Sequence, residues 1–131
     1  MSAASGAGFV AGRHIIDAYG AGGFRFAGMS HVGSILATPR GVCAVAASEL
    51  SELRVEHFAP LLMEIAQAPG SVELLVVGVG EKMARLPASL STRLRSAGLR
   101  LEAMATGPAA RVYNVLVAED RRVAALLLAA P

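Results

Sequence analysis

The residue types best suited to binding chemistry gather in one stretch, residues 102–116. Thr106 stands where an alternating apolar segment gives way to a helical pattern, and Arg111, Tyr113 and Asn114 follow it closely. A guanidinium can hold an anion while a phenol and an amide orient it. The stretch predicts a polar pocket or partner-binding patch, or else a set of polar groups that only hold strand, cap and helix together.

Several residues of this stretch also have ordinary structural explanations. The hydroxyl of Thr106 could accept a free N–H at the start of a helix that has Pro108 in its first position. Glu102 and Arg111 could form an ion pair, and Asn114 could hydrogen-bond a loop. Both interpretations stay open on the sequence alone.

A second candidate is the loop Gly78-Val79-Gly80, which follows a buried-strand pattern at residues 72–77. Glycines in such a loop let backbone N–H groups approach a phosphate. The third glycine of a dinucleotide fingerprint is missing, because Met83 occupies its place, and no Walker pattern follows Lys82. The loop therefore predicts, at most, a crevice for some anionic ligand at the carboxyl end of a strand.

No other residues form a recognisable catalytic or metal site. His14, His31 and His57 share no short spacing, whereas a zinc site needs three or four converging ligands. The single cysteine, Cys43, lies in an apolar run, which favours a buried small hydrophobe over a nucleophile. We therefore predict no catalytic residue, no metal and no cofactor, and consider an enzyme less favoured than a binding protein.

The composition indicates one folded domain. The chain has 131 residues, of which 54% are hydrophobic and 17% charged, so apolar surface should remain for a protein partner or a second copy of the chain. The net charge is only +2 and the basic residues are scattered, which argues against nucleic-acid binding. We expect residues 1–12 to be a flexible tail and residues 13–131 to form the domain. We expect no signal peptide and no transmembrane segment, and therefore a cytoplasmic location.

Hydrophobic periodicity predicts a β-rich first third followed by alternating helices and strands. The expected strands cover residues 14–19, 24–26, 34–38, 42–45, 72–77, 99–104 and 123–128, and residues 28–33 are expected to form a turn. The expected helices cover residues 58–66, the segment between Pro87 and Gly98, and residues 106–117. Strands that alternate with helices favour a parallel or mixed sheet.

Beyond these patterns, the chain resembles a known family over nearly its whole length, from about Ile15 to Leu128. The resemblance is carried by Tyr19, Gly22-Gly23-Phe24, Gly28, Gly33-Ser34, Leu36, Gly78-Val79-Gly80, Glu102-Ala103-Met104, Thr106, Ala109-Ala110-Arg111, Tyr113-Asn114-Val115-Leu116 and Glu119-Asp120-Arg121-Arg122-Val123-Ala124-Ala125. The family consists of small α/β proteins long catalogued as a domain of unknown function. It includes the mitochondrial NADH:ubiquinone oxidoreductase complex assembly factor three.

The resemblance implies a fold and a role. The fold would be a three-layer α/β domain with a central mixed sheet, helices on both sides and an N-terminal β-hairpin layer. The role would be that of a non-enzymatic interaction protein, an assembly-type factor for respiratory complex I, whose partners are respiratory complex subunits or other assembly factors. Two departures from the family pattern weaken the argument for an aromatic surface at residue 45 and for a catalytic reading of the polar cluster, respectively. The family often has tryptophan where this chain has Val45, and usually threonine where it has Val112.

Three functions thus remain as predictions. The leading one is the interaction protein, the second is an anion-binding protein or unrecognised enzyme with a pocket near Gly78–Gly80, and the third is a homo-oligomer that buries the apolar surplus. The candidate binding residues for a pocket or partner patch are Gly78, Gly80, Glu102, Thr106, Arg111, Tyr113, Asn114 and Arg122.

Overall fold

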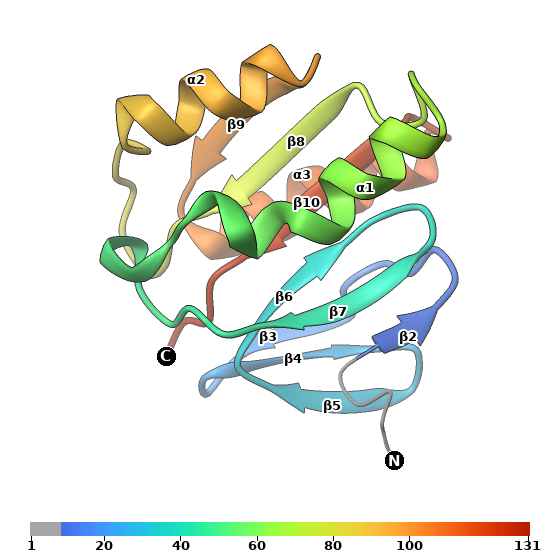
Figure 1. The fold of residues 1–131 in the computed structure, drawn as a ribbon. Helices are drawn as coiled ribbons and strands as arrows, with labels where there is room; N and C mark the ends of the chain where they lie inside the picture. Colours follow the sequence, from blue (N-terminus) through green and yellow to red (C-terminus); the bar gives the residue numbers. More distant parts are fainter. Residues whose placement is uncertain (1–8) are drawn as a thin grey trace.

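A six-stranded mixed sheet forms the centre of the computed structural model, which describes residues 9–131 (Figure 1). Its strands lie in the order β2 (Phe9–Ala11), β7 (Gly41–Val45), β6 (Ser34–Ala37), β10 (Val123–Leu127), β8 (Leu74–Gly78) and β9 (Arg100–Met104). Neighbours from β2 to β10 are antiparallel, whereas β10, β8 and β9 are parallel to one another. The mixed sheet predicted for the family is thereby confirmed.

Two helices, α1 (Ala59–Gln67) and α2 (Ala88–Ser96), cover one face of this sheet (Figure 1). Two short 3-10 turns, η1 (Leu50–Glu52) and η2 (Val55–Phe58), lead into α1. Pro60 occupies the first turn of α1, where its missing N–H costs no hydrogen bond. Gly98 ends α2 with a φ of +93°, a left-handed conformation that suits glycine.

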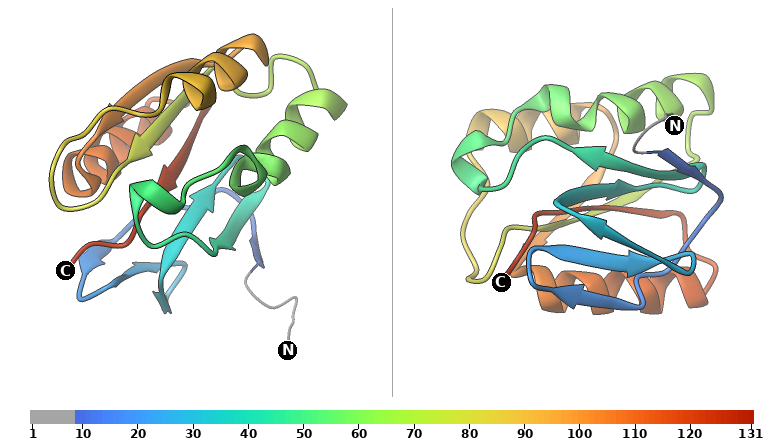
Figure 2. Two further views of the ribbon diagram at one scale, coloured as in Figure 1. Left: turned by 60° about the vertical axis from the view of Figure 1, so that its left-hand side comes forward. Right: turned by 90° about the horizontal axis from the view of Figure 1, so that it is seen from below.

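The opposite face carries α3 (Thr106–Ala118) and a separate three-stranded antiparallel sheet (Figure 2). That small sheet consists of β3 (Ala18–Gly20), β4 (Gly23–Phe26) and β5 (Met29–Val32). Phe24 and Phe26 on β4 are buried together with Tyr113 of α3 and Val76 of β8. Helices therefore lie on both faces, and the hairpin sheet forms part of one outer layer, as expected.

The central strands supply both hydrophobic cores. On β10, Leu126 belongs to the core under α1 and α2, whereas Val123, Ala125 and Leu127 belong to the core under α3 and the small sheet. A strand that is buried on both faces needs a continuous apolar sequence, which is the pattern that identified this strand. No helix among residues 9–131 has the length and apolar character needed to cross a membrane.

Three predictions about the N-terminal third are wrong. A strand was expected at residues 14–19, but β3 begins only at Ala18 and residues 13–17 form no strand. The flexible tail was expected to reach residue 12, but Phe9–Ala11 form β2 and pair with Gly41–Cys43 of β7; residues 1–8 lie outside the described part. Residues 28–33 were expected to form a turn, but Met29–Val32 form β5 and pair with β4. β2 and β5 are edge strands whose short, mixed sequences acquire their structure by pairing with a neighbour.

Candidate functional site

Thr106 joins the ends of three central strands. Its hydroxyl donates to the carbonyl of Leu128 at 2.7 Å and accepts from the N–H of Gly80 at 3.0 Å, while its own N–H donates to the carbonyl of Gly80 at 2.8 Å. Thr106 is completely buried and lies inside the first turn of α3, so the prediction that its hydroxyl caps the helix is wrong. The residue connects α3, the loop after β8 and the end of β10.

Gly78 makes the close approach of α3 possible. A Cβ at this position would lie 2.9 Å from Cα of Thr106 and 3.0 Å from its Oγ1. The N–H groups of the next two residues are also used, because Val79 donates to the carbonyl of Met104 at 2.9 Å and Gly80 to Thr106. The N–H groups that would cradle an anion at this loop are therefore already occupied.

Tyr113 and Asn114 fasten the segment before β3 to α3. The Tyr113 hydroxyl donates to the carbonyl of His14 at 2.9 Å. The Asn114 amide bonds the backbone of Ile16 twice, accepting from its N–H and donating to its carbonyl, both at 2.8 Å. These side chains replace the strand partner that the segment lacks, and they agree with the expectation that Asn114 bonds a loop.

Burial makes the phenol of Tyr113 an unusually weak acid. Its side chain is fully buried, and loss of water around the phenolate raises the pKa of Tyr113 to about 12, although the charge of Arg13 lowers it slightly. The phenol is therefore neutral at physiological pH and acts as a hydrogen-bond donor. Burial also raises the pKa of the Cys43 thiol, which is half-buried and points to the carbonyl of Leu36 at 3.8 Å.

The remaining candidate residues lie elsewhere. Arg122 forms an ion pair with Glu73 at 3.3 Å and donates to the carbonyl of Gly70, before the start of β8. Glu102 is exposed on β9, and among residues 9–131 it makes no ion pair with Arg111. The eight candidates therefore do not share one cavity: Gly78, Gly80 and Thr106 meet at a packed junction, and the others lie apart from it.

Arg111 lines a groove between β3 and α3. The groove has a volume of about 350 Å³, and Tyr19, Asp17, Arg111 and Asn114 contribute to its walls. The ring of Tyr19 lies over Gly107, where a Cβ would come within 2.7 Å of its Cζ. Tyr19 nevertheless stays 45% exposed, so the groove offers an aromatic ring beside a guanidinium.

This groove was only partly visible in the sequence. Arg111 and Asn114 were singled out for their chemistry, whereas Tyr19 was noted only as part of an expected strand and of the family resemblance. Asp17 and Gly107 gave no signal of a shared site, since they lie 90 residues apart along the chain. The pairing of an exposed tyrosine with a distant glycine could be found only after β3 had been placed against α3.

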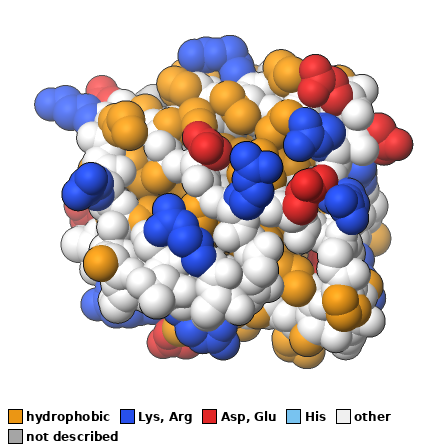
Figure 3. Space-filling view, turned by 90° about the horizontal axis from the view of Figure 1, so that it is seen from above, with side chains coloured by type: hydrophobic (Ala, Val, Ile, Leu, Met, Phe, Trp, Pro, Cys, Tyr) orange, Lys and Arg blue, Asp and Glu red, His pale blue; other side chains and the backbone are white. Residues whose placement is uncertain are grey.

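The charges elsewhere on the surface are dispersed. Figure 3 views the molecule from above Figure 1, the end at which α2 and β9 lie, and shows hydrophobic side chains exposed between separate basic and acidic ones. The described residues include no group of three or more acidic, histidine or cysteine side chains that could hold a metal ion.

Comparison with known proteins places the chain among relatives of the same fold. It is 38% identical over 122 residues to an uncharacterised protein of Rhodobacter capsulatus, covering 92% of this chain and 89% of that protein. It is 27% identical over 113 residues to the NADH dehydrogenase [ubiquinone] 1 alpha subcomplex assembly factor 3 of Xenopus tropicalis, covering 86% of this chain and 60% of the relative.

A solved structure and a family model agree with this relationship. The crystal structure of a Bartonella henselae protein described as an outer membrane protein is 42% identical, with a TM-score of 0.84, and the match covers 92% of this chain and 98% of that one. The family model for proteins of unknown function DUF498/DUF598 matches residues 16–128. The chain therefore belongs to the DUF498/DUF598 family, which confirms the resemblance carried by its residues.

Proposed function

We propose that this protein is an interaction protein that assists the assembly of respiratory complex I. The observation that carries the proposal is the similarity to the Xenopus tropicalis assembly factor, which extends over 86% of this chain. The match covers 60% of that relative's own length. The partners would be complex I subunits or other assembly factors.

The internal hydrogen bonds of the polar cluster support a binding role over a catalytic one. Thr106, Tyr113 and Asn114 all use their polar atoms on the backbone of the same chain. A catalytic group has to reach a substrate atom, either directly or through a water molecule. The occupied N–H groups of Val79 and Gly80 likewise weigh against the alternative of an anion pocket at that loop.

The groove between β3 and α3 is the surface that we assign to the partner. It presents the half-exposed ring of Tyr19 and the side chain of Arg111. Ile15, which precedes the groove residue Ile16, and Val115, one helical turn after Arg111, are 45% and 56% exposed. Tyrosine and arginine are the residues most often enriched where partners bind tightly. An apolar partner side chain beside a carboxylate would fit this combination.

A deletion strain of the host provides the direct test. Membranes from the strain are expected to lack assembled complex I on a native gel and to lose NADH:ubiquinone activity, while the wild-type gene restores both. A double variant, Tyr19→Ala with Arg111→Glu, should fail to restore them although the purified protein stays folded. The matched control is Arg93→Glu, a change of the same charge on the exposed surface of α2.

Two results would contradict the assembly role. Normal amounts of active complex I in the deletion strain would exclude it, and rescue by the groove variant would exclude the groove as its surface. Fractionation of the same cells tests the proposed cytoplasmic location, and light scattering of the purified chain tests homo-oligomerisation. Recovery in an outer membrane fraction would contradict the cytoplasmic location.

A further inference from the structure

Within residues 9–131, the outer edge of β9 has no strand beside it, because β9 is the last strand of the large sheet. The N–H of Arg100 donates to the backbone carbonyl of Glu73, and the carbonyl of Met104 accepts from the N–H of Val79. Both residues therefore direct their backbone groups toward β8. Backbone groups alternate in direction along a strand. Leu101 and Ala103 therefore direct their N–H and C=O groups outward, and no other strand of residues 9–131 bonds them.

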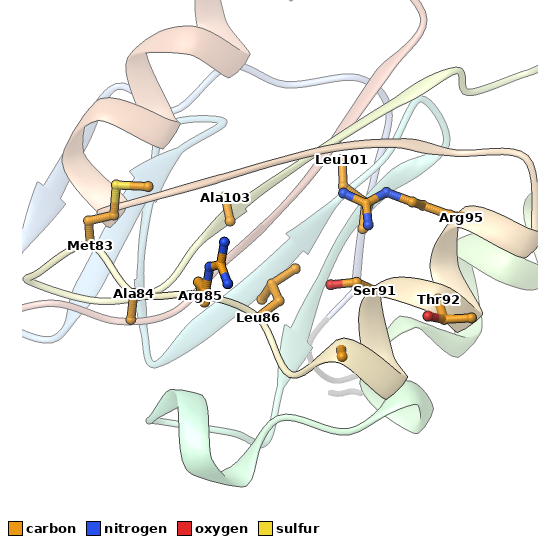
Figure 4. Close-up of a pocket in the computed structure, with 10 residues that line it drawn as sticks. Met83, Ala84, Arg85, Leu86, Ser91, Thr92, Arg95, Leu101 and Ala103 are labelled. Carbon is orange, nitrogen blue, oxygen red and sulfur yellow. The ribbon is translucent and has the colours of Figure 1, made fainter.

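The same two residues line a cavity of about 350 Å³ between β9, α2 and the loop before α2 (Figure 4). Met83 and Leu86 add apolar walls, and Ser91 of α2 places its hydroxyl at the side. The available backbone groups and a cavity with both apolar and polar walls thus occur at one place. Such an edge binds extended peptides when the side-chain chemistry suits them.

Two arginines supply that chemistry. In Figure 4 the guanidinium of Arg95 lies beside Leu101, and that of Arg85 lies toward Ala103. Both side chains are exposed, and the ion pairs formed by residues 9–131 involve neither of them. The residues beside the two cations, Leu101 and Ala103, are alternate residues of β9 and are spaced roughly 7 Å along the strand.

We propose that the edge of β9 binds an extended acidic segment of a protein partner as an additional strand. Residues opposite each other on paired strands point to the same face of a sheet. Partner residues opposite Leu101 and Ala103 would therefore face the cavity, and carboxylates at these alternate positions would meet Arg95 and Arg85. The proposal depends on β9, α2 and the loop before α2, and it does not require the assembly role.

The charges favour this occupant over a second copy of the chain. If β9 paired with β9 of another copy about a two-fold axis, α2 of both copies would lie on one face of the joined sheet. That arrangement would bring two Arg85 and two Arg95 side chains together, and like charges in close contact are unfavourable. An acidic peptide instead neutralises both arginines and bonds the backbone of Leu101 and Ala103.

The test uses the full chain and a fluorescent nine-residue peptide of Thr and Val with two Glu residues placed two apart. One control peptide carries Lys in place of Glu, and another carries an N-methyl group at each backbone N–H that would face β9. The amide signals of Leu101 and Ala103 should shift with the first peptide alone. Arg85→Glu and Arg95→Glu should each weaken binding by about tenfold, while Arg93→Glu, which lies outside the cavity, should leave it unchanged.

Three outcomes would overturn the proposal. The first is no binding, or equal binding of the Lys peptide. The second is amide shifts that map away from β9. The third combines two results: inorganic phosphate or glutarate alone shifts the amide signals as much as the peptide does, and N-methylation of the peptide does not weaken its binding. That combination would identify a site for a free anion and not for a strand.

Discussion

The junction between β8 and α3 and the outer edge of β9 lie on neighbouring strands, but they use their polar groups differently. At the junction, Thr106 and Gly80 satisfy one another and the end of β10 within a packed interior. At the edge, Arg85 and Arg95 line an open cavity without an ion-pair partner among residues 9–131. Polar residues near a strand end can therefore be structural or available for binding, and their packing decides which.

The largest effect is expected from Gly78→Ala. The added Cβ would press on Thr106, whose backbone cannot move without shifting α3, so we expect a loss of about 2 kcal/mol in the free energy of unfolding. Urea unfolding followed by circular dichroism measures it. Gly107→Ala is the control, because there the Cβ meets the half-exposed ring of Tyr19, which can swing away. Equal stability of Gly78→Ala and the wild type would contradict the packed junction.

Asn114→Ala should have the next largest effect, about 2 kcal/mol at most, because two hydrogen bonds to Ile16 are lost. The loss should be local, and hydrogen exchange at the Ile16 amide should accelerate more than exchange in β10. Val115→Ala, on the exposed side of the same helix, provides the matched control. Unchanged protection of Ile16 in the Asn114 variant would show that the segment is held by other contacts.

Tyr113→Phe tests the buried phenol, with an expected cost of about 1 kcal/mol for the hydrogen bond to His14. Its pH dependence is more specific. The pKa of Tyr113 is raised to about 12 in the folded protein, so an unfolded chain loses this proton at lower pH. The wild type should therefore lose stability as the pH rises from about 10 toward 12, and this part of the loss should disappear in the Phe variant. Tyr19→Phe should retain it.

The smallest effect is expected at the edge of β9. Arg85→Ala and Arg95→Ala should each change the free energy of unfolding by no more than about 0.5 kcal/mol, because exposed side chains without partners contribute little. Thermal unfolding measures the stability of the two variants. Arg122→Ala is unfolded alongside them as the comparison, because Arg122 is paired with Glu73. A large loss in either edge variant would mean that these arginines serve the fold.

The strands and helices of the C-terminal two thirds could be predicted because their residues repeat at the period of the element. The apolar run of β10 and the helical spacing in α1 each indicate one element directly. β2 and β5 could not be predicted, since Phe9–Ala11 and Met29–Val32 become strands only beside their neighbours. Local sequence patterns contain little information about such edge strands.

The candidate site was predictable only in its residue types. Thr106, Tyr113 and Asn114 were identified from one stretch, but their partners Leu128, His14 and Ile16 lie 22, 99 and 98 residues away. No local pattern reports contacts at that separation. Arg85 and Arg95 were regarded as scattered charges, because the position of β9 at the edge of the sheet becomes known only from the strand order.

The position of β10 has a consequence for folding during synthesis on the ribosome. β10 follows all other strands of residues 9–131 along the chain, yet it lies in the centre of the sheet, where it joins the antiparallel strands ending at β6 to the parallel pair β8 and β9. Until residue 127 has been synthesised, both halves present an unpaired apolar edge. The nascent chain therefore depends on late, long-range closure, a stage at which chaperones and wrong strand partners compete for it.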